Sequence, residues 1–519
     1  MEDSQNLGEK RIDSKSLLPF VSGLLIILSQ PPFPFFFLAY FSIVPLLLSL
    51  KEDGSKADFF SGLKTGIIAF TGLIYWVVIA MNRYGGINIG ASVACMLLLS
   101  LYLALYTAFF TYILSFLRSK LSVPTYLCAP FVWTLLEYVR NYMLSGFPWA
   151  LLAYSQHSFL PFIQICSFTG PYYISFLIVS MNCAIVILLK GLLRVRSGLI
   201  FFLFVVCASS FSIFYGVLKL KEDYLLQDGI RVGIIQASIR QDVKWTEDLK
   251  MKSLQKHMIS TIRAERESDF FVWSETALPF VLEEKEEVLK TISELAKSMG
   301  KPILTGSLSR DKERRLYNAA FLLGKDGKVL GIYRKVHLVP FGEYTPLARY
   351  FPFLERISVT GEDFSPGKDH NPLSLEGFGK VGILICYEGI FPDISRETVR
   401  KGANLLVNLT NDAWYDRSSA PYQHLAFYIF RAVETERYVV RCANTGISAI
   451  IDPKGRIIRR SRLFTEEVLC GQVFGISKKT FYVIYGDWFV LISLLFFLST
   501  IGYHLLIKSS GSKRDIFGT

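Results

Sequence analysis

Long apolar runs fill the first 220 residues of the chain and return once near its end. They lie at residues 17–30, 33–50, 60–81, 89–117, 123–142, 162–189, 197–218 and 484–507. A helix that crosses a bilayer needs about 20 apolar residues, so this pattern predicts about eight membrane spans. The first run is the shortest, and it ends at Pro31-Pro32.

A polar block lies between the seventh and eighth runs. Its segments of strand type are residues 230–236, 269–274, 302–307, 318–323, 329–333, 381–386, 404–409 and 446–451, and its segments of helix type are 246–267, 284–299, 392–401 and 420–440. Asp326-Gly327 and residues 453–455 are typical of hairpin turns. The alternation of strands and helices predicts an α/β domain.

These two patterns divide the chain into four parts. We expect an N-terminal membrane domain of seven spans at 1–220, an α/β domain at 221–483, a C-terminal span at 484–507 and a tail at 508–519. A hydrophobic content of 51% and a mean hydropathy of +0.36 agree with a polytopic membrane protein.

The net charge of +12 does not indicate nucleic-acid binding, because the basic residues are dispersed and no nucleic-acid motif is present.

The basic residues of the loops predict the orientation of the spans. Thirteen Lys and Arg residues lie in the N-terminal segment, in the loops after the second, fourth and sixth runs, and in the tail, whereas the alternate loops hold only Arg83 and Arg140. Cytoplasmic loops carry the excess of Lys and Arg, so both termini should be cytoplasmic. The α/β domain then lies outside the cytoplasm, where no ATP is available, and its chemistry must use an already activated donor.

Eight cysteines divide in the same way. Five lie in apolar runs, where they are most simply small core residues, and the polar block holds Cys386, Cys442 and Cys470. We expect Cys442 and Cys470 to be core thiols. No spacing resembles a zinc site, and we expect neither a metal nor another cofactor.

Three strand-type segments of the polar block end in residues with complementary chemistry. Glu275 follows the strand at 269–274, Lys335 follows 329–333, and Cys386 ends 381–386. Together they suggest acyl transfer: a thiolate attacks an ester or amide carbonyl, a carboxylate serves as general base and acid, and a cation stabilises the oxyanion. Each residue alone is more simply structural, since a buried cysteine is usually core and a charged strand end is usually solvated.

Wider motifs around these residues carry a resemblance. The segments Trp273-Ser274-Glu275, 334–343 (RKVHLVPFGE) and Cys386-Tyr387-Glu388 resemble the Glu–Lys–Cys triad of the nitrilase superfamily. The 335–344 loop (KVHLVPFGEY), the NDAWY stretch at 411–415, the EYVR and GFPW elements at 137–140 and 146–149, and the proline-rich stretch at 31–47 are similar to signatures of the apolipoprotein N-acyltransferase family. Tyr138 and Tyr415 stand where that family often has tryptophan and phenylalanine.

The resemblance implies a fold and a reaction. It implies a nitrilase-like α-β-β-α sandwich on the periplasmic side of a bacterial inner membrane. Cys386 would take an acyl chain from a phospholipid, usually phosphatidylethanolamine, and pass it to the α-amine of a diacylglyceryl-cysteine at an apolipoprotein N-terminus. The family assigns the base to Glu275, the oxyanion stabiliser to Lys335 and the nucleophile to Cys386. Supporting or substrate-lining roles fall to Glu343, Tyr387, Glu388, Trp414 and, on a mobile arm, Trp245. We expect a monomer.

Other interpretations of these residues stay open. Glu137 and Arg140 could form a buried ion pair on a substrate path or merely fix helix packing at the interface. The GFPW element at 146–149 could be a lipid-facing wall of the site or part of an aromatic belt. His337 more simply braces its loop than serves as a base, and His424 has the position of a structural residue on a helix face.

Two other functions compete with the acyltransferase. A membrane-tethered amidase or nitrilase could use the same triad on a small C–N substrate, but eight spans would then have no purpose. A transporter or envelope scaffold with an inactive outer domain is the other class, and an intact Glu275, Lys335 and Cys386 argue against it.

Overall fold

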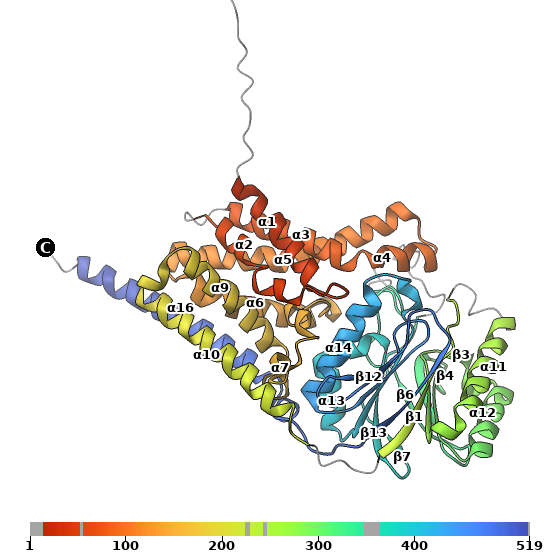
Figure 1. Ribbon diagram of the computed structural model, residues 1–519. Coiled ribbons are helices and arrows are strands. Elements are labelled where there is room, and N and C mark those ends of the chain that lie inside the picture. The colour runs from red at the N-terminus through yellow and green to blue at the C-terminus, as the bar shows by residue number, and fades with distance from the viewer. Residues whose placement is uncertain (1–13, 52–55, 224–228, 242–246, 347–362, 517–519) are drawn as a thin grey trace, which may run out of the picture.

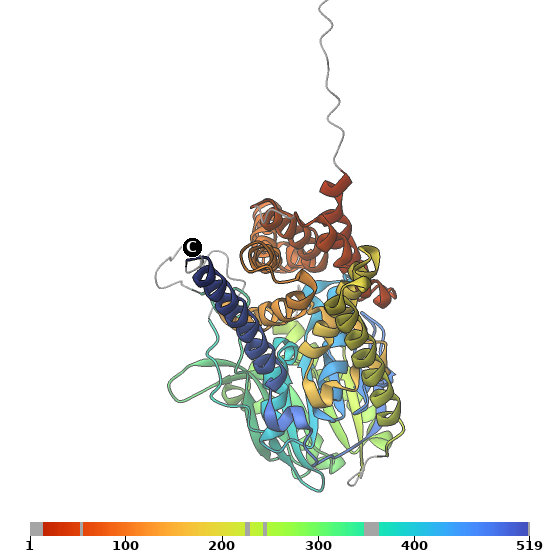
Figure 2. The ribbon, with the colours of Figure 1, turned by 90° about the vertical axis from the view of Figure 1, so that its left-hand side faces the viewer.

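The chain folds into a helical part and an α/β part that pack side by side. The computed structural model describes residues 14–51, 56–223, 229–241, 247–346 and 363–516. Helices from both ends of the sequence make the helical part, and the residues between β1 (Gly229–Gln236) and β13 (Glu467–Phe474) make the α/β part (Figures 1 and 2).

The helical part contains helices of very different length. Five of those described are long and apolar enough to cross a membrane: α3 (Lys56–Ile74), α5 (Ile89–Leu121), α9 (Tyr172–Leu189), α10 (Arg196–Lys219) and α16 (Trp488–Ile516). The shorter helices include α1 (Leu18–Ser29), α2 (Val44–Ser49), α4 (Trp76–Ile79), α6 (Thr125–Tyr142), α7 (Leu160–Ile163) and α8 (Cys166–Thr169).

Three of the predicted runs are wrong as continuous helices. Residues 33–50 divide into η2 (Phe36–Tyr40) and α2, residues 60–81 divide among α3, α4 and η3 (Ala80–Tyr84), and residues 162–189 divide among α7, α8 and α9. Proline lacks the N–H that a helix interior needs, and in the first and last of these runs Pro34, Pro45 and Pro171 fall at the breaks or at the helix starts that follow them. The run at 123–142 does form one helix, α6.

Two β-sheets form the centre of the α/β part. The first has the order β13-β1-β2-β4-β5-β6, with β3 (Leu278–Val281) beside β4, and the second has the order β12-β11-β10-β9-β8-β7. The remaining strands are β2 (Phe270–Trp273), β4 (Ile303–Arg310), β5 (Leu316–Leu323), β6 (Val329–Arg334), β7 (Leu373–Leu375), β8 (Gly379–Ile385), β9 (Leu405–Thr410), β10 (Val439–Ala443), β11 (Ala449–Ile451) and β12 (Ile457–Arg460). In both sheets the central neighbours, β1-β2-β4 and β8-β9-β10, run parallel.

The sheets pack face to face, and helices cover both outer faces. Branched side chains of both sheets, such as Val272 and Ile383, share one apolar core. Helices α11 (Glu247–Arg263) and α12 (Glu286–Met299) cover the first sheet, and α13 (Pro392–Arg400) and α14 (Ala420–Thr435) cover the second (Figure 1). The expected α-β-β-α sandwich is therefore confirmed.

Helix α14 is shorter than the predicted helix at 420–440. It ends at Thr435, Glu436 adopts a left-handed conformation, and residues 439–443 form the interior strand β10. That strand pairs with β9 and β11 on its two sides. Pairing with β9 and β11 determines the strand conformation of residues 439–443, and the local sequence does not indicate which strands will pair with them.

Helix α14 also joins the two parts of the molecule. One face packs on the second sheet, while Phe427 packs its ring against Trp149 and Tyr154 of the helical part, at centroid distances of 5.0 and 4.7 Å.

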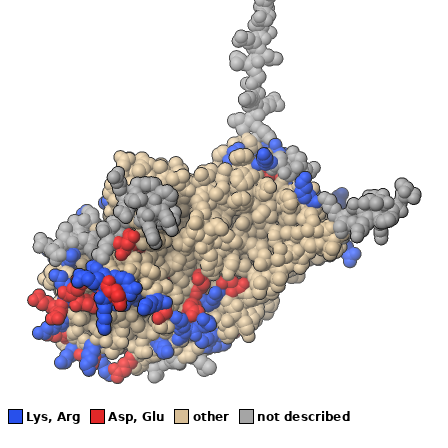
Figure 3. Space-filling view, turned by 180° about the vertical axis from the view of Figure 1, so that it is seen from behind, with Lys and Arg blue, Asp and Glu red and all other residues tan. Residues whose placement is uncertain are grey.

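The surface charge differs between the two parts. In Figure 3 the Lys, Arg, Asp and Glu side chains gather over the α/β part, and most of the helical part is free of them. The uncharged surface is suited to lipid.

Arg431 of α14 is a fully buried charged residue at this junction. Its side chain is completely buried, and its guanidinium bonds the Glu434 carboxylate at 2.6 Å, the Ile390 carbonyl at 3.1 Å and the Tyr154 hydroxyl at 3.2 Å. Loss of one partner of a buried ion pair leaves an uncompensated charge in a medium of low dielectric constant.

We expect Arg431→Met to destabilise the protein by about 3–5 kcal/mol, because Glu434 stays buried without its partner. Thermal unfolding in detergent measures the change. Arg400→Met is the matched control: Arg400 pairs with Glu397 at the surface, and loss of an exposed pair costs about 1 kcal/mol or less. Equal shifts of the two variants would contradict the structural role of Arg431.

Candidate active site

Three strand ends bring Glu275, Lys335 and Cys386 to one buried site between the sheets. Glu275 follows β2 and Lys335 follows β6, both in the first sheet, and Cys386 follows β8 of the second. The Lys335 Nζ atom lies 3.8 Å from Glu275 Oε1. All three side chains are buried, and the charges of Glu275 and Lys335 act on the Cys386 thiol, so the three residues lie together as expected.

Lys335 lies between two carboxylates. Its Nζ atom is 2.8 Å from Glu343 Oε2 in addition to its contact with Glu275, and its side chain is only 1% exposed. Burial alone would lower the pKa of this ammonium, but the negative charges of Glu343 and Glu275 outweigh burial and raise the pKa above its usual range. Lys335 is therefore a permanent cation.

Asn318 of β5 links the two carboxylates. Its Nδ2 atom donates to Glu275 Oε1 at 2.8 Å and to Glu343 Oε1 at 2.9 Å. The Asn318 carbonyl also accepts from the Lys335 backbone N–H at 2.8 Å. Sequence analysis missed this residue, because a lone asparagine inside an apolar strand gives no signal of its partners.

The backbone of Cys386 is held in an uncommon conformation. Its φ is +51°, in the left-handed region that non-glycine residues avoid. The Tyr428 hydroxyl donates to the Cys386 carbonyl at 3.0 Å, and Gly389 lets this tyrosine approach, because a Cβ at Gly389 would lie 2.0 Å from the hydroxyl oxygen. Strain of this kind persists only where surrounding contacts fix it, and it is common at active sites.

The Cys386 thiol is neutral in the resting site. Burial raises the pKa of the thiol most, and the Glu275 charge raises it further, while the Lys335 charge and a hydrogen bond with Thr410 act in the opposite direction. The net direction is well above the ordinary thiol pKa. A base must therefore remove the thiol proton when the sulfur attacks.

Glu388 braces the ends of β6 and β8. Its carboxylate accepts from the backbone N–H of Val336 and of Ile385, both at 2.7 Å, and from the Tyr333 hydroxyl at 2.9 Å. Burial raises the Glu388 pKa to about 7, while these hydrogen bonds and the Lys335 charge limit the rise. One side chain thus fixes the strands that carry Lys335 and Cys386.

Tyr387 and His337 connect the site to the helical part. The Tyr387 hydroxyl donates to the Gly146 carbonyl at 3.0 Å. The His337 ring packs at a tilt against the Phe391 ring, with the centroids 4.1 Å apart, and burial, assisted by the Lys335 charge, lowers the His337 pKa to about 4. A neutral histidine packed against a ring agrees with the bracing role expected for it.

The two tryptophans predicted for the site have different outcomes. Trp414, in η11 (Asp412–Tyr415), is half-buried, and its ring lies 6.0 Å from that of Tyr84 in the helical part. Trp245 lies outside the described residues. The NDAWY stretch reaches the site through Asp412, whose charge acts on the Cys386 thiol.

Asp412 belongs to a buried cluster that sequence analysis did not assemble. Its carboxylate bonds Arg441 Nη2 at 2.5 Å and His424 Nδ1 at 2.9 Å. The Arg441 and His424 contacts outweigh burial and lower the Asp412 pKa to about 2. His424 is thus structural, as expected, but it positions a carboxylate beside the site. Its helix-face position alone could not indicate that partner.

The GFPW element is buried except for the partly exposed Phe147, so it does not form an aromatic belt, and its role as a wall of the site stays a prediction. Trp149 is 1% exposed, and its ring N–H donates to Gln423 Oε1 of α14 at 2.7 Å. The Trp149 ring packs against Trp76 at 4.6 Å. The element joins the helical part to α14 because tryptophan combines a large apolar ring with one donor.

No group of three or more His, Cys, Asp or Glu side chains is arranged to hold a metal ion in the part of the chain that the structure describes. All eight cysteines are free thiols. The chemistry of the site is that of a thiol, a carboxylate and an ammonium.

Comparisons with known proteins agree with this arrangement. Residues 231–474 match the family described as carbon-nitrogen hydrolase, which defines the class of the α/β domain, and residues 22–184 match the apolipoprotein N-acyltransferase N-terminal domain. The apolipoprotein N-acyltransferase of Geobacter metallireducens is 38% identical over 500 residues, covering 91% of this chain and 92% of the relative. The chain belongs to the apolipoprotein N-acyltransferase family, and it is an acyltransferase.

Two further comparisons are more distant. The apolipoprotein N-acyltransferase of Chlorobaculum tepidum is 30% identical, covering 91% of this chain and 92% of the relative. The crystal structure of a carbon-nitrogen hydrolase from Helicobacter pylori is 17% identical with a TM-score of 0.38, covering 47% of this chain and 88% of that one.

The electrostatics of the site predict how Cys386 reacts with iodoacetamide. We expect Glu275→Gln to speed alkylation at a fixed alkaline pH, because loss of the negative charge lowers the thiol pKa. We expect Lys335→Met to slow it, because loss of the positive charge raises that pKa. One pKa unit changes the thiolate fraction about tenfold. Peptide mass spectrometry over a pH series measures both rates, with Cys470 in the same digests as the control. A shift in the opposite direction for either variant would contradict this electrostatic arrangement.

Proposed function

We propose that this protein carries an acyl chain from a phospholipid to the N-terminal α-amine of a diacylglyceryl-cysteine in apolipoproteins, by way of a Cys386 thioester. The observation that carries the proposal is the buried cluster of Glu275, Lys335 and Cys386, on a chain whose family transfers acyl groups. Phosphatidylethanolamine is the donor we favour. An ester donor needs no ATP, which suits a site outside the cytoplasm.

In the first half-reaction, Glu275 takes the proton of the Cys386 thiol while the sulfur attacks the ester carbonyl of the donor. Lys335 stabilises the oxyanion, and one such donor is worth roughly 3–4 kcal/mol. The intermediate collapses, the C–O bond breaks, and Glu275 returns its proton to the leaving oxygen. The products are a thioester at Cys386 and a lysophospholipid.

In the second half-reaction, the α-amine of the acceptor attacks the thioester carbonyl. Glu275 accepts a proton from the attacking nitrogen and returns it to the departing Cys386 sulfur as the C–S bond breaks. The product amide is more stable than the thioester, so transfer is downhill. Burial of the cluster limits hydrolysis of the intermediate.

The charge balance of the cluster supports Glu275 as the base. With Glu275 and Glu343 ionised and Lys335 protonated, the cluster carries one net negative charge, so a thiolate formed by loss of a proton to water would add a second. Transfer of that proton to Glu275 keeps the net charge constant. The proton transfer therefore places no additional charge in the buried site, and it adds no desolvation free energy.

The remaining residues take supporting roles. Glu343 holds Lys335, Glu388 fixes the two strand ends, and Tyr387 ties the site to the loop at Gly146. We assign Trp414 to the lining of the site, beside Tyr84. We assign Trp245 to an arm near the entrance only because the sequence resembles the family at that position.

We further propose eight spans, with both termini in the cytoplasm and the catalytic domain, 221–483, in the periplasm. Contacts between the parts support this orientation. Arg83, in the loop after the third run, pairs with Asp416 of the catalytic domain, and Gly146, in the loop after the fifth run, bonds Tyr387. The family places the protein in the bacterial inner membrane. We propose that it works as a monomer without a cofactor.

Intact-protein mass spectrometry tests the proposal. After incubation with phosphatidylethanolamine, we expect the wild-type protein to gain the mass of one fatty acyl group, because the thioester persists in a dry site. A diacylglyceryl lipopeptide should then discharge it. Cys386→Ala should show no gain.

Cys470→Ala is the matched control, since it removes a thiol of the same domain that is only half-buried and outside the cluster. It should acylate as the wild type does. A folded wild-type protein that gains no acyl group would refute the proposal. Release of ammonia from small amides would then favour the amidase alternative.

A further inference from the structure

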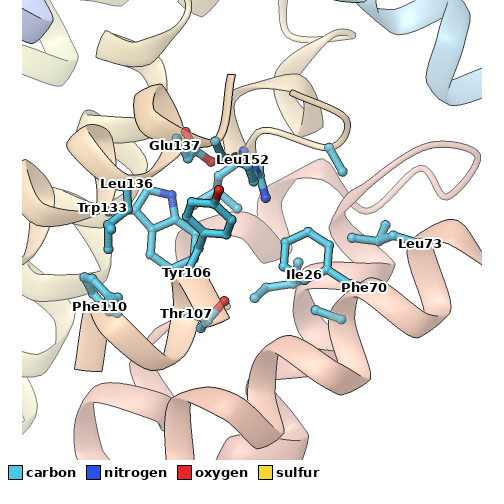
Figure 4. Close-up of a pocket in the computed structure, with 13 residues that line it drawn as sticks. Ile26, Phe70, Leu73, Tyr106, Thr107, Phe110, Trp133, Leu136, Glu137 and Leu152 are labelled. Atoms are coloured by element: carbon cyan, nitrogen blue, oxygen red, sulfur yellow. Dashed lines mark hydrogen bonds between the residues drawn. The ribbon is translucent and has the colours of Figure 1, made fainter. Parts of the chain in front are cut away.

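The cavity among the membrane helices is too small for a lipid or a peptide. It is lined by side chains of α1, α3, α5 and α6, and its volume of about 40 Å³ is room for a few water molecules (Figure 4). Glu137 and Arg140 of α6 line it, and their charges compensate each other. Trp133, Ser175 and the Leu152 N–H are further polar partners of that glutamate. This geometry favours helix packing, one of the two roles that the sequence left open for the pair.

An irregular segment of the α/β part, residues 363–371, has a closer relation to the active site. It lies before β7 and contains neither a helix nor a strand. Its backbone nevertheless has fixed partners in the site. The Phe364 N–H donates to the Glu343 carbonyl at 2.8 Å, and the Gly367 N–H donates to the Lys335 carbonyl at 2.7 Å. Two residues of the site are thus held through their main chains by one segment.

The bond from Gly367 completes the support of the Lys335 main chain. Strand β6 ends at Arg334, so Lys335 lies just beyond the sheet. The Asn318 carbonyl accepts from the Lys335 N–H at 2.8 Å, and the Lys335 carbonyl accepts from Gly367. A lysine ammonium is carried on a flexible four-carbon stem, so a fixed backbone limits the positions that it can reach.

The close approach at position 367 requires glycine. A Cβ there would lie 2.1 Å from the Arg334 carbonyl oxygen, whereas a Cβ normally stays at least 3.0 Å from its neighbours. The obstructing atom belongs to the backbone of the residue before Lys335, so it cannot rotate away as a side chain would. Alanine at position 367 would therefore push the segment and the Lys335 backbone apart by about 1 Å.

His370 gives the segment a second link to the site. Its Nδ1 atom lies 3.2 Å from the Tyr333 hydroxyl, which donates to Glu388 Oε1 at 2.9 Å. A hydroxyl has one proton, so the His370 ring N–H is the donor to the Tyr333 oxygen. The Glu388 carboxylate in turn bonds the backbone after β6 and at the end of β8. The segment is thereby linked to the strand end that carries Cys386 as well as to Lys335.

We propose that residues 363–371 are a positioning element of the triad, in which Gly367 fixes the place of Lys335 and His370, through Tyr333, fixes that of Glu388. The three contact positions, 364, 367 and 370, are spaced three apart, and residues 366, 368 and 369 between them are exposed. One edge of the segment therefore faces the site. This role rests on the proposed function, and the segment acts through Lys335 and Glu388 without touching the reacting atoms.

Alkylation of Cys386 by iodoacetamide tests the link through Lys335. We expect Gly367→Ala to slow alkylation at a fixed alkaline pH about tenfold, because a displaced ammonium no longer lowers the thiol pKa. In Lys335→Met protein the same change should have no further effect, since the group that it displaces is gone. Single-turnover thioester formation should fall about 100-fold in rate at saturating donor, with little change in the apparent KM. Additive losses in the double variant would overturn the role of Gly367.

Gly327→Ala is the matched control for a general loss of packing. Gly327 lies in the turn between β5 and β6 with a φ of +81°, and a Cβ there would lie 2.5 Å from the Ser293 carbonyl oxygen. Alanine at this position strains the fold away from the site. It should lower the unfolding temperature and leave Cys386 alkylation unchanged. Equal slowing of alkylation in the two glycine variants would overturn the proposal.

His370→Ala tests the second link, because it removes a partly exposed side chain and leaves Gly367 in place. We expect single-turnover thioester formation to slow about fivefold, the value of one hydrogen bond. No further slowing should occur in Tyr333→Phe protein, which lacks the hydroxyl between His370 and Glu388. The same loss in both backgrounds would overturn this link. A wild-type protein that forms no thioester, while the alkylation results hold, would refute the proposed function alone.

Discussion

The site depends on one interaction, the burial of the Lys335 ammonium between the carboxylates of Glu275 and Glu343. A cation that is 1% exposed is tolerable only because two anions neutralise it, and the anions are tolerable only because Asn318 and Lys335 satisfy them. Burial, assisted by the negative charge of Glu275, keeps the nearby Cys386 thiol neutral. In the proposed mechanism, the resting enzyme thereby protects its nucleophile, Cys386, and holds Glu275, the base that activates it.

The two sheets make this arrangement possible. Glu275 and Lys335 come from the first sheet and Cys386 from the second, so the cluster exists only when the sheets face each other. Glu388 then ties the sheets together at that point, since its carboxylate bonds the backbone after β6 and at the end of β8. The packing of the two sheets that forms the apolar core therefore also brings the side chains of the cluster together.

The membrane helices take part in the same architecture. Trp149 is wedged between Trp76 and α14, and Tyr387 bonds the loop that carries Trp149. A shift of the helical part would therefore move a neighbour of Cys386. In the proposed reaction both substrates are lipids, and this coupling ties the neighbour of Cys386 to the helical part that contacts the membrane.

The sequence by itself determined most of the elements and the three residues that we propose as the triad. Apolar runs predicted the long helices, and the periodicity of the polar block predicted eight strands close to their observed positions, because both patterns reflect local burial. The motifs around Glu275, Lys335 and Cys386 were readable because they are contiguous. The tertiary structure decided what depends on distant partners: the strand β10, the link through Asn318, the pair of Asp412 with His424, and the burial of Trp149. Each of these is a contact between residues far apart in the chain, and no local pattern specifies which distant group will satisfy a buried polar atom.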